Sequence, residues 1–152
     1  MRRRLAATAL LAAPVLVLLP LAATAAETPP VFEGTWIVTA GQAVLHGRWS
    51  AQALPGEPDD MQGSWSMAND AGAEVMKGTW SAQRARRGFK GKWSARAANG
   101  GLFKGTFEAH LPGFKGKTLQ DMFAETQTKQ ISGFWRMGGA KGAWYLKASA
   151  AK

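Results

Sequence analysis

Apolar and polar residues alternate with period two in several stretches of the chain, as expected for strands that bury one face. From Phe89 to Arg96, one face would carry Phe, Gly, Trp and Ala, and the other Lys, Lys, Ser and Arg. The same split recurs in the segments LHGRWSAQ and MKGTWSA. The pattern predicts strands with an apolar, glycine and aromatic inner face and an outer face of Ser, Thr, Lys and Arg.

Each of the eight predicted strands is assigned one copy of the motif Gly-x-aromatic, and these eight copies include all seven tryptophans. The motif begins at Gly34, Gly47, Gly63, Gly78, Gly91, Gly105, Gly133 and Gly142. Most copies follow one another after 13 to 16 residues, the length of one strand and one turn. Turn-forming segments such as AGQA, AANGG and MGGA separate them. These short connections predict an antiparallel meander.

The order Gly-x-Trp reverses between antiparallel neighbours, so we expect each indole to lie opposite a glycine of the next strand and to cover its bare backbone. In the last hairpin, a Gly138-Gly139 turn would place Trp135 opposite Gly142 and Gly133 opposite Trp144. Closure would leave no exposed edge. The prediction is an all-β fold: an eight-stranded antiparallel up-and-down β-barrel (meander) with one short α-helix between strands 6 and 7.

That helix is predicted in the long gap between the sixth and seventh motifs. Thr118 followed by Asp121 is typical of a helix N-cap with an acid in the first turn. Leu119, Met122 and Phe123 would share one face. We expect an amphipathic helix from about residue 118 to 128 that closes one barrel mouth or lies on the outer wall, either as a core cover or as a movable lid.

The predicted inner face is rich in tryptophan, and an eight-stranded barrel can be filled by side chains or hold one small ligand. Because the glycines make room for the indoles, we expect a largely filled interior. The alternative is a pocket for a small apolar ligand, lined by Trp49, Trp65, Trp80 and Trp93.

A few apolar residues fall on the predicted outer face of the first and last strands. They are Val31, Ile37, Phe134 and Tyr145, on strands that become neighbours when the barrel closes. We expect the helix to cover this patch, and a partner interface is the alternative.

The N-terminus has the pattern of a secretory signal peptide. Three arginines at positions 2 to 4 precede an apolar run from Leu5 to Leu21 and then small residues, with cleavage expected after Ala25 or Ala26. An uncleaved anchor is the alternative, but two prolines interrupt the apolar run. We therefore divide the chain into a signal peptide, 1–26, and a single β-barrel domain, 27–152, without a transmembrane span in the mature chain.

The signal peptide predicts a periplasmic or secreted protein. The chain has no cysteine, so the exported domain would be stable without disulfides. Its formal net charge of +9 is unevenly distributed, because seven acids and one arginine lie between Glu27 and Glu74, whereas 15 basic residues and three acids follow from Val75 onward. Such asymmetry favours an anionic partner for the second half, or head-to-tail self-association.

The basic residues concentrate around the fourth to sixth predicted strands. The candidate basic face consists of Arg84, Arg86, Arg87, Lys90, Lys92, Arg96 and Lys104. Clustered cations of this kind suit phosphate or carboxylate groups. After export, the expected partner is lipopolysaccharide, anionic lipid, cell-wall polymer or an acidic protein, and nucleic acid is disfavoured. The alternative is that these cations only keep the barrel soluble and guard its strands against edge pairing.

Catalytic signals are weak. His46 and His110 stand on different predicted strands without metal-ligand spacing, and the recurrent serines are outward positions of the repeat. Glu57, Asp59 and Asp60 read as a solvated acidic loop, because they lack the full ligand spacing of a calcium loop. We therefore expect no enzyme, no metal site and no cofactor.

The signal peptide, the F-x-G-x-W-S-A strands and the late segment KTLQDMFAE…SGFWRMGGAKGAWYL resemble uncharacterised exported bacterial proteins built from Gly-x-Trp repeats. The architecture also resembles that of lipocalin and avidin barrels, although a shared fold does not transfer their ligands. Two hypotheses follow. The first is a non-catalytic exported envelope protein whose rigid barrel presents the basic face to an anionic partner. The alternative is a carrier for a small apolar ligand inside the barrel.

Overall fold

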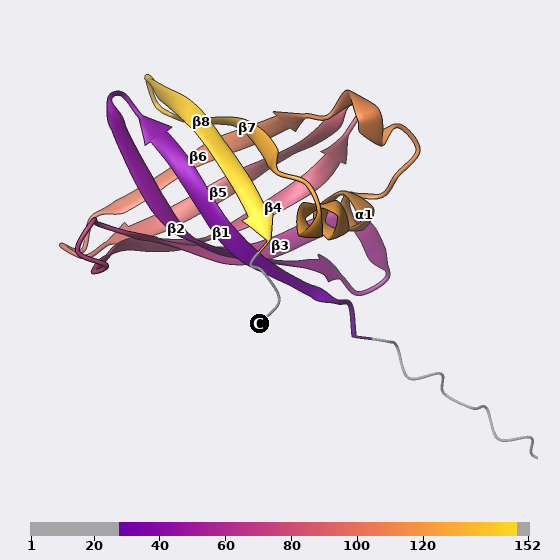
Figure 1. Cartoon of the computed structure of the whole chain (residues 1–152), viewed down its shortest axis with the longest axis horizontal. Coiled ribbons are helices and arrows are strands. Elements are labelled where there is room, and N and C mark those ends of the chain that lie inside the picture. The colour runs from indigo at the N-terminus through magenta and orange to yellow at the C-terminus, as the bar shows by residue number, and fades with distance from the viewer. Residues whose placement is uncertain (1–27, 149–152) are drawn as a thin grey trace, which may run out of the picture.

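The computed structural model describes residues 28–148, which form one closed barrel of eight strands in chain order (Figure 1). The strands are β1 Val31–Ala40, β2 Ala43–Leu54, β3 Glu57–Ala68, β4 Glu74–Ala85, β5 Gly88–Ala97, β6 Leu102–His110, β7 Ile131–Met137 and β8 Ala140–Ala148. The predicted signal peptide lies outside the described residues.

All eight strand pairs are antiparallel, and the sheet closes where β8 pairs with β1, with Tyr145 opposite Ile37. No free sheet edge remains among these strands, as the closed order requires. The predicted fold class is confirmed: a meander barrel with one short α-helix between β6 and β7.

The register confirms the predicted pairing of indoles with glycines, because each tryptophan lies opposite a glycine of one neighbouring strand. In the last hairpin, Trp135 lies opposite Gly142 and Gly133 opposite Trp144. The β1–β2, β3–β4 and β5–β6 hairpins share this arrangement. Across the β1–β8 interface, Trp36 faces Leu146. Across the β2–β3, β4–β5 and β6–β7 interfaces, aromatic residues face one another instead, as Trp80 faces Trp93. The two-residue turn after Ala85 lies midway between these two tryptophans, which sets them in register.

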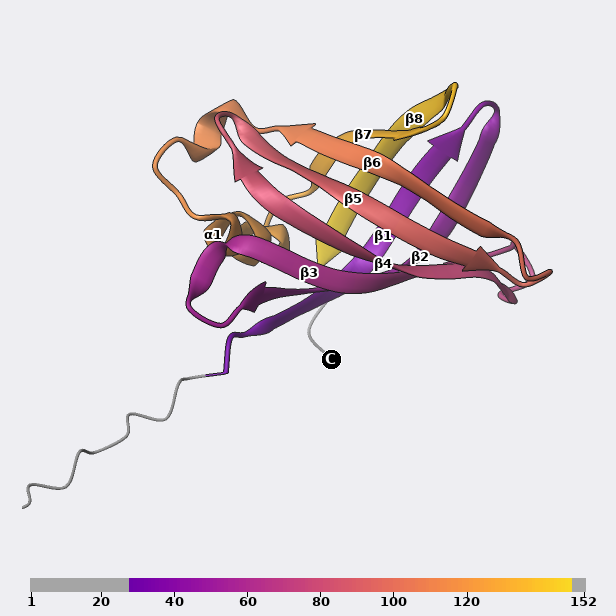
Figure 2. The same ribbon diagram turned by 180° about the vertical axis from the view of Figure 1, so that it is seen from behind.

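The helical segment between β6 and β7 begins with the turn Pro112–Phe114, continues as α1 Leu119–Ala124 and ends in the turn Glu125–Gln127. Thr118 caps α1 as predicted. Its hydroxyl accepts a hydrogen bond from the backbone N–H of Asp121, and the Asp121 carboxylate accepts one from the backbone N–H of Thr118. The helix lies across one end of the barrel, at the right of Figure 1 and the left of Figure 2.

The position of α1 decides between the two predicted locations. Leu119, Met122 and Phe123 are fully buried at the barrel end, so the helix closes a mouth and does not lie on the outer wall. The expectation that it covers the outer apolar patch is therefore wrong. Val31 and Phe134 keep exposed fractions of 56% and 61%.

Candidate functional site

The interior of the barrel contains a cavity of about 260 Å³. Every side chain that lines it is Trp, Phe, Met, Leu, Val or Ala. The four predicted ligand-facing tryptophans, Trp49, Trp65, Trp80 and Trp93, all belong to this lining. The expectation of a largely filled interior is wrong, because the indoles surround a hollow.

The orientation of the indoles explains why the centre stays empty. Trp36 donates its N–H to the Ser66 carbonyl at 2.8 Å, and Trp135 donates to the Thr39 carbonyl at 2.9 Å. Each ring thus crosses the neighbouring strand over its glycine and bonds to the strand beyond. The rings lie against the wall with their polar edge occupied, so they present carbon to the cavity.

Trp144 does not share this arrangement. The N–H of Trp144 is buried and has no hydrogen-bond partner among the described residues. The edge of this ring that covers Gly133 consists of the carbons Cζ2 and Cε2. Trp144 still lines the cavity, where it contacts Phe89 and Phe107 at centroid distances of 5.8 and 6.2 Å.

Phe123 of α1 forms the floor of the cavity. Its ring stacks on Trp80 at a centroid distance of 5.4 Å and also contacts Phe89 and Trp49, at 5.5 and 5.8 Å. Together these aromatic contacts close the helix end.

Polar contacts hold the helical segment against the barrel wall. Asp59 accepts a hydrogen bond from the backbone N–H of Leu119 at 2.9 Å. Arg84 lies 3.8 Å from the same carboxylate and donates to the Phe114 carbonyl at 3.5 Å. Asp59 therefore belongs to β3 and supports α1, which corrects the prediction that Glu57, Asp59 and Asp60 form a loop.

The opposite end of the cavity reaches the four hairpins that join β1 to β2, β3 to β4, β5 to β6 and β7 to β8, at the left of Figure 1. There the lining consists of half-buried Leu45, Met76 and Met137, together with Phe103, which is 37% exposed. The cavity is thus closed at one end by α1, which forms its base. At the opposite end, called the mouth below, it opens between apolar side chains.

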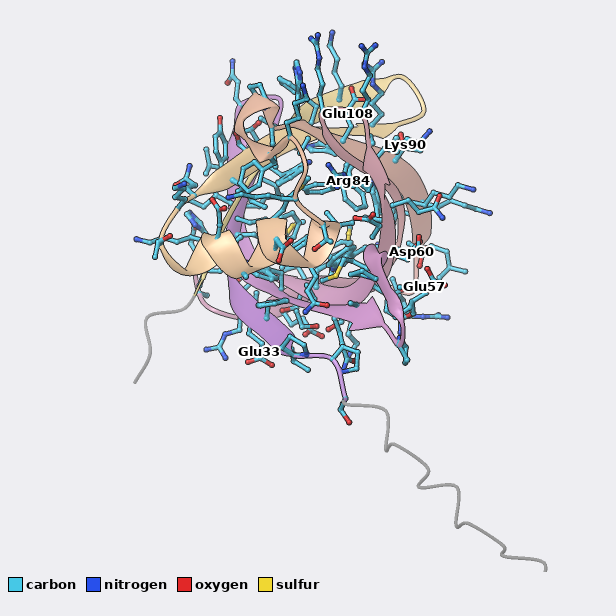
Figure 3. The ribbon with its side chains drawn as sticks, turned by 90° about the vertical axis from the view of Figure 1, so that its right-hand side faces the viewer. Glu33, Glu57, Asp60, Arg84, Lys90 and Glu108 are labelled. Atoms are coloured by element: carbon cyan, nitrogen blue, oxygen red, sulfur yellow. The ribbon has the colours of Figure 1, made fainter. Side chains whose placement is uncertain are left out.

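The predicted basic face is divided by the structure. Lys90, Lys92, Arg96 and Lys104 are exposed on the outer face of β5 and β6, and Arg86 and Arg87 form the exposed turn between β4 and β5. Arg84 does not join them. It shares the inward parity of Trp80 and lies beside the helix, within the outline of the barrel in Figure 3, whereas Lys90 lies outside it.

Two carboxyl groups of the helical segment have perturbed pKa values. Hydrogen bonds from the backbone and side chain of Thr118 lower the pKa of Asp121. The pKa of Glu125 is lowered by its contacts with the ammonium groups of Lys117 and Lys129. Both groups stabilise the helical segment, and neither lines the cavity.

Within residues 28–148, no three side chains of His, Cys, Asp or Glu come close enough to hold a metal ion. No helix of that part of the chain is long and apolar enough to cross a membrane. Comparison of the sequence and structure with protein-family models, curated proteins and solved structures finds no match. The function of the protein is therefore inferred from the cavity and from the exposed surface.

Proposed function

We propose that the protein is a non-catalytic carrier that holds one small, uncharged apolar molecule inside the barrel. The supporting observation is the cavity of about 260 Å³ with a wholly apolar side-chain lining, a closed base and an open mouth. Eight-stranded barrels have room for one small ligand. Apolar cavities of this kind exclude water and bind apolar molecules.

The size of the void supports a ligand. Side chains that line a void lack van der Waals partners on that side, and this void measures about 260 Å³. A bound ligand would restore the missing contacts.

The lining also defines the ligand class. None of its side chains carries a charge, and the indole N–H groups of Trp36, Trp80 and Trp135 are already bonded to backbone carbonyls. An ionised head group would lose its hydration without compensation. The ligand is therefore neutral, or keeps its polar end at the mouth.

A series of straight-chain alcohols tests the proposal by displacement of N-phenyl-1-naphthylamine, a neutral apolar fluorophore. Each additional methylene contributes about 0.8 kcal/mol when buried, so affinity should rise about fourfold per carbon until the cavity is full, and then level off. Affinity that is independent of chain length would contradict a cavity of defined size.

Two variants on adjacent residues provide a matched control. Leu45→Trp adds bulk to the cavity lining, whereas His46→Trp adds an indole to the exposed outer face of the same strand. We expect the first to weaken fluorophore binding at least tenfold and the second to leave it unchanged. Equal binding by both variants would place the fluorophore outside the barrel.

A second candidate function is binding of an anionic partner through the exposed part of the basic face. Its support is the exposure of Arg86, Arg87, Lys90 and Lys92, with Glu108 as the nearest acid on the paired strand. Reversal of these four residues to Glu should abolish retention on lipopolysaccharide, and retention by the unaltered protein should fall steeply with salt. Retention that ignores salt would exclude this function.

Both proposals assume export. Sequencing the N-terminus of the protein purified from the periplasm or the medium should identify Ala26 or Glu27 as the first residue. An intact N-terminus starting at Met1 would refute the cleavage.

A further inference from the structure

The rim of the open mouth carries exposed apolar side chains. Leu102 at the start of β6 is 71% exposed, Val44 at the start of β2 is 52% exposed, and Phe103 faces the mouth at 37%. Leu102 and Val44 stand on strands four places apart in the closed order, so they lie on different sides of the mouth. Exposed apolar residues that form a patch with a polar rim mark a candidate interaction surface.

Cations accompany these apolar residues. Arg96 is the strand partner of Leu102, and Lys104 follows two residues later on the same outer face. Arg136 and Lys141 are partners on β7 and β8, each one residue from the strand end at the β7–β8 turn. All four side chains are exposed, and the guanidinium of Arg136 lies 3.9 Å from the Glu108 carboxylate of β6.

Among the four hairpins at the mouth, acidic residues are confined to one. Asp70 and Glu74 belong to the β3–β4 connection and the start of β4, and Glu74 pairs with Lys77. The other three hairpins carry none, because the sequence has no Asp or Glu in residues 34–56, 88–107 or 126–152. The β3–β4 hairpin is therefore the acidic part of the mouth. The other three hairpins form a continuous sector with apolar and cationic side chains.

The outer wall extends this sector away from the rim. Phe134 is 61% exposed on β7, and Ile37, 38% exposed, is the strand partner of Tyr145. These residues lie on β7, β8 and β1, the strands behind the Arg136–Lys141 pair. An apolar strip thus runs along the wall behind the basic rim.

We propose that this end of the barrel docks on a bilayer containing anionic lipids. Exposed apolar side chains enter the interface of such a bilayer, while neighbouring lysines and arginines bind its head groups. The cavity opens at the same end, so an apolar cargo passes between bilayer and barrel without crossing water. The transfer step rests on the proposed carrier function, whereas docking depends only on the surface.

Vesicle sedimentation with the chain from residue 27 onward, which contains the whole closed barrel, tests docking. Vesicles of phosphatidylglycerol and phosphatidylethanolamine are compared with vesicles of phosphatidylcholine alone. Each cation near an anionic surface contributes about fivefold to binding. We therefore expect Arg96, Lys104, Arg136 and Lys141, all changed to Gln, to lower binding at least a hundredfold.

A control variant removes the same charge from the other end. Arg86, Arg87, Lys90 and Lys115, which lie toward the helix end, should lower vesicle binding less than tenfold when changed to Gln, through the net charge alone. An equal loss in both variants would overturn docking through the mouth, as would equal binding of the unaltered protein to both kinds of vesicle. If the protein bound soluble polyglutamate as tightly as anionic vesicles, the surface would be a general polyanion-binding surface, and docking on a bilayer would also be overturned.

The apolar contribution is tested by Leu102→Ser with Val44→Ser, at exposed positions outside the cavity lining. Vesicle binding should fall about tenfold while fluorophore binding in solution stays unchanged. Transfer of N-phenyl-1-naphthylamine to vesicles should speed up with vesicle concentration in the unaltered protein and lose this dependence in the variant. A transfer rate independent of vesicle concentration would refute transfer on contact.

These measurements separate the two proposals. A protein that binds vesicles but not the fluorophore would refute the carrier function and leave docking supported. A protein that binds the fluorophore but not anionic vesicles would refute docking and leave the carrier function supported.

Discussion

At the scale of single residues, glycine and tryptophan act as a pair that shapes the wall. A methyl group added at Gly47 would lie 1.8 Å from the Ser66 carbonyl oxygen and 2.2 Å from Nε1 of Trp36. The strand glycines at 63, 78, 91, 105, 133 and 142 would likewise meet a backbone carbonyl at 1.8 to 2.2 Å. Glycine at these positions lets neighbouring backbone approach closely, and at all of them except Gly78 an aromatic ring approaches as well. The motif therefore determines how tightly the wall of the barrel packs.

Gly47→Ala tests this role. Because the added methyl group meets backbone, the strands must separate, and we expect a loss of at least ~3 kcal/mol in the free energy of unfolding. Gly139→Ala is the matched control, since nothing lies within 4 Å of its added methyl group, and it should change stability by less than ~0.5 kcal/mol. Urea denaturation measures both. A small effect at Gly47 would mean that the close approach is not a constraint.

The sequence predicted these residues unevenly, for physical reasons. Alternation identified the inward tryptophans, because parity depends only on neighbours along the chain. Arg84 has the same parity as Trp80, which predicts an inward side chain, as the structure has it. Its position in a run of basic residues led instead to its assignment to the outer basic face. Cavity volume could not be predicted, because it depends on whether an indole turns along the wall or toward the axis. Hydrogen bonds to distant carbonyls such as Ser66 O decide that.

At the scale of elements, α1 is a short helix that depends on its contacts. Six residues form too few hydrogen bonds to be stable alone. The Thr118 capping box, the Asp59 contact to Leu119 and the burial of Phe123 supply what the helix lacks. The cap was predictable from local sequence, but Asp59 lies 60 residues from its partner, so only the closed barrel brings the two together.

The capping box predicts a pH dependence. The folded state lowers the pKa of Asp121 below its ordinary value of 3.8, so its contribution is complete above that value and is lost as pH falls through the lower, folded-state pKa. Near neutral pH, Asp121→Asn should cost up to about 1 kcal/mol, a small value because the carboxylate is exposed. The difference from the unaltered protein should shrink below about pH 4.

Chemical denaturation at several pH values measures this difference. Asp70→Asn serves as the control, because it removes the same charge from an exposed residue of the β3–β4 connection, at the opposite end of the barrel. A difference for Asp121→Asn that persists unchanged to low pH would show that the ionised carboxylate is not the stabilising form.

At the scale of the whole molecule, the two ends of the barrel differ in construction. The helix end is closed by aromatic stacking on Phe123 and by contacts such as Arg84 with Asp59. At the other end, no helix of the described barrel covers the hairpins, and apolar and basic side chains are exposed. The helix end therefore makes the barrel rigid, and the opposite end gives access to the cavity.

A ligand that occupies the cavity can be detected through the thermal stability of the barrel. A ligand that binds only the folded barrel, at a free concentration of 100 times its Kd, adds about 2.7 kcal/mol to the free energy of unfolding. For a domain of this size, the corresponding rise in Tm is about 10 °C. We expect this shift with N-phenyl-1-naphthylamine for the unaltered protein and for His46→Trp, and a much smaller one for Leu45→Trp at the same concentration. An equal shift in all three proteins would mean that stabilisation arises at the outer surface. A rise in Tm that is restricted to the unaltered protein and His46→Trp, whose cavities are unobstructed, would show that the ligand binds inside the barrel.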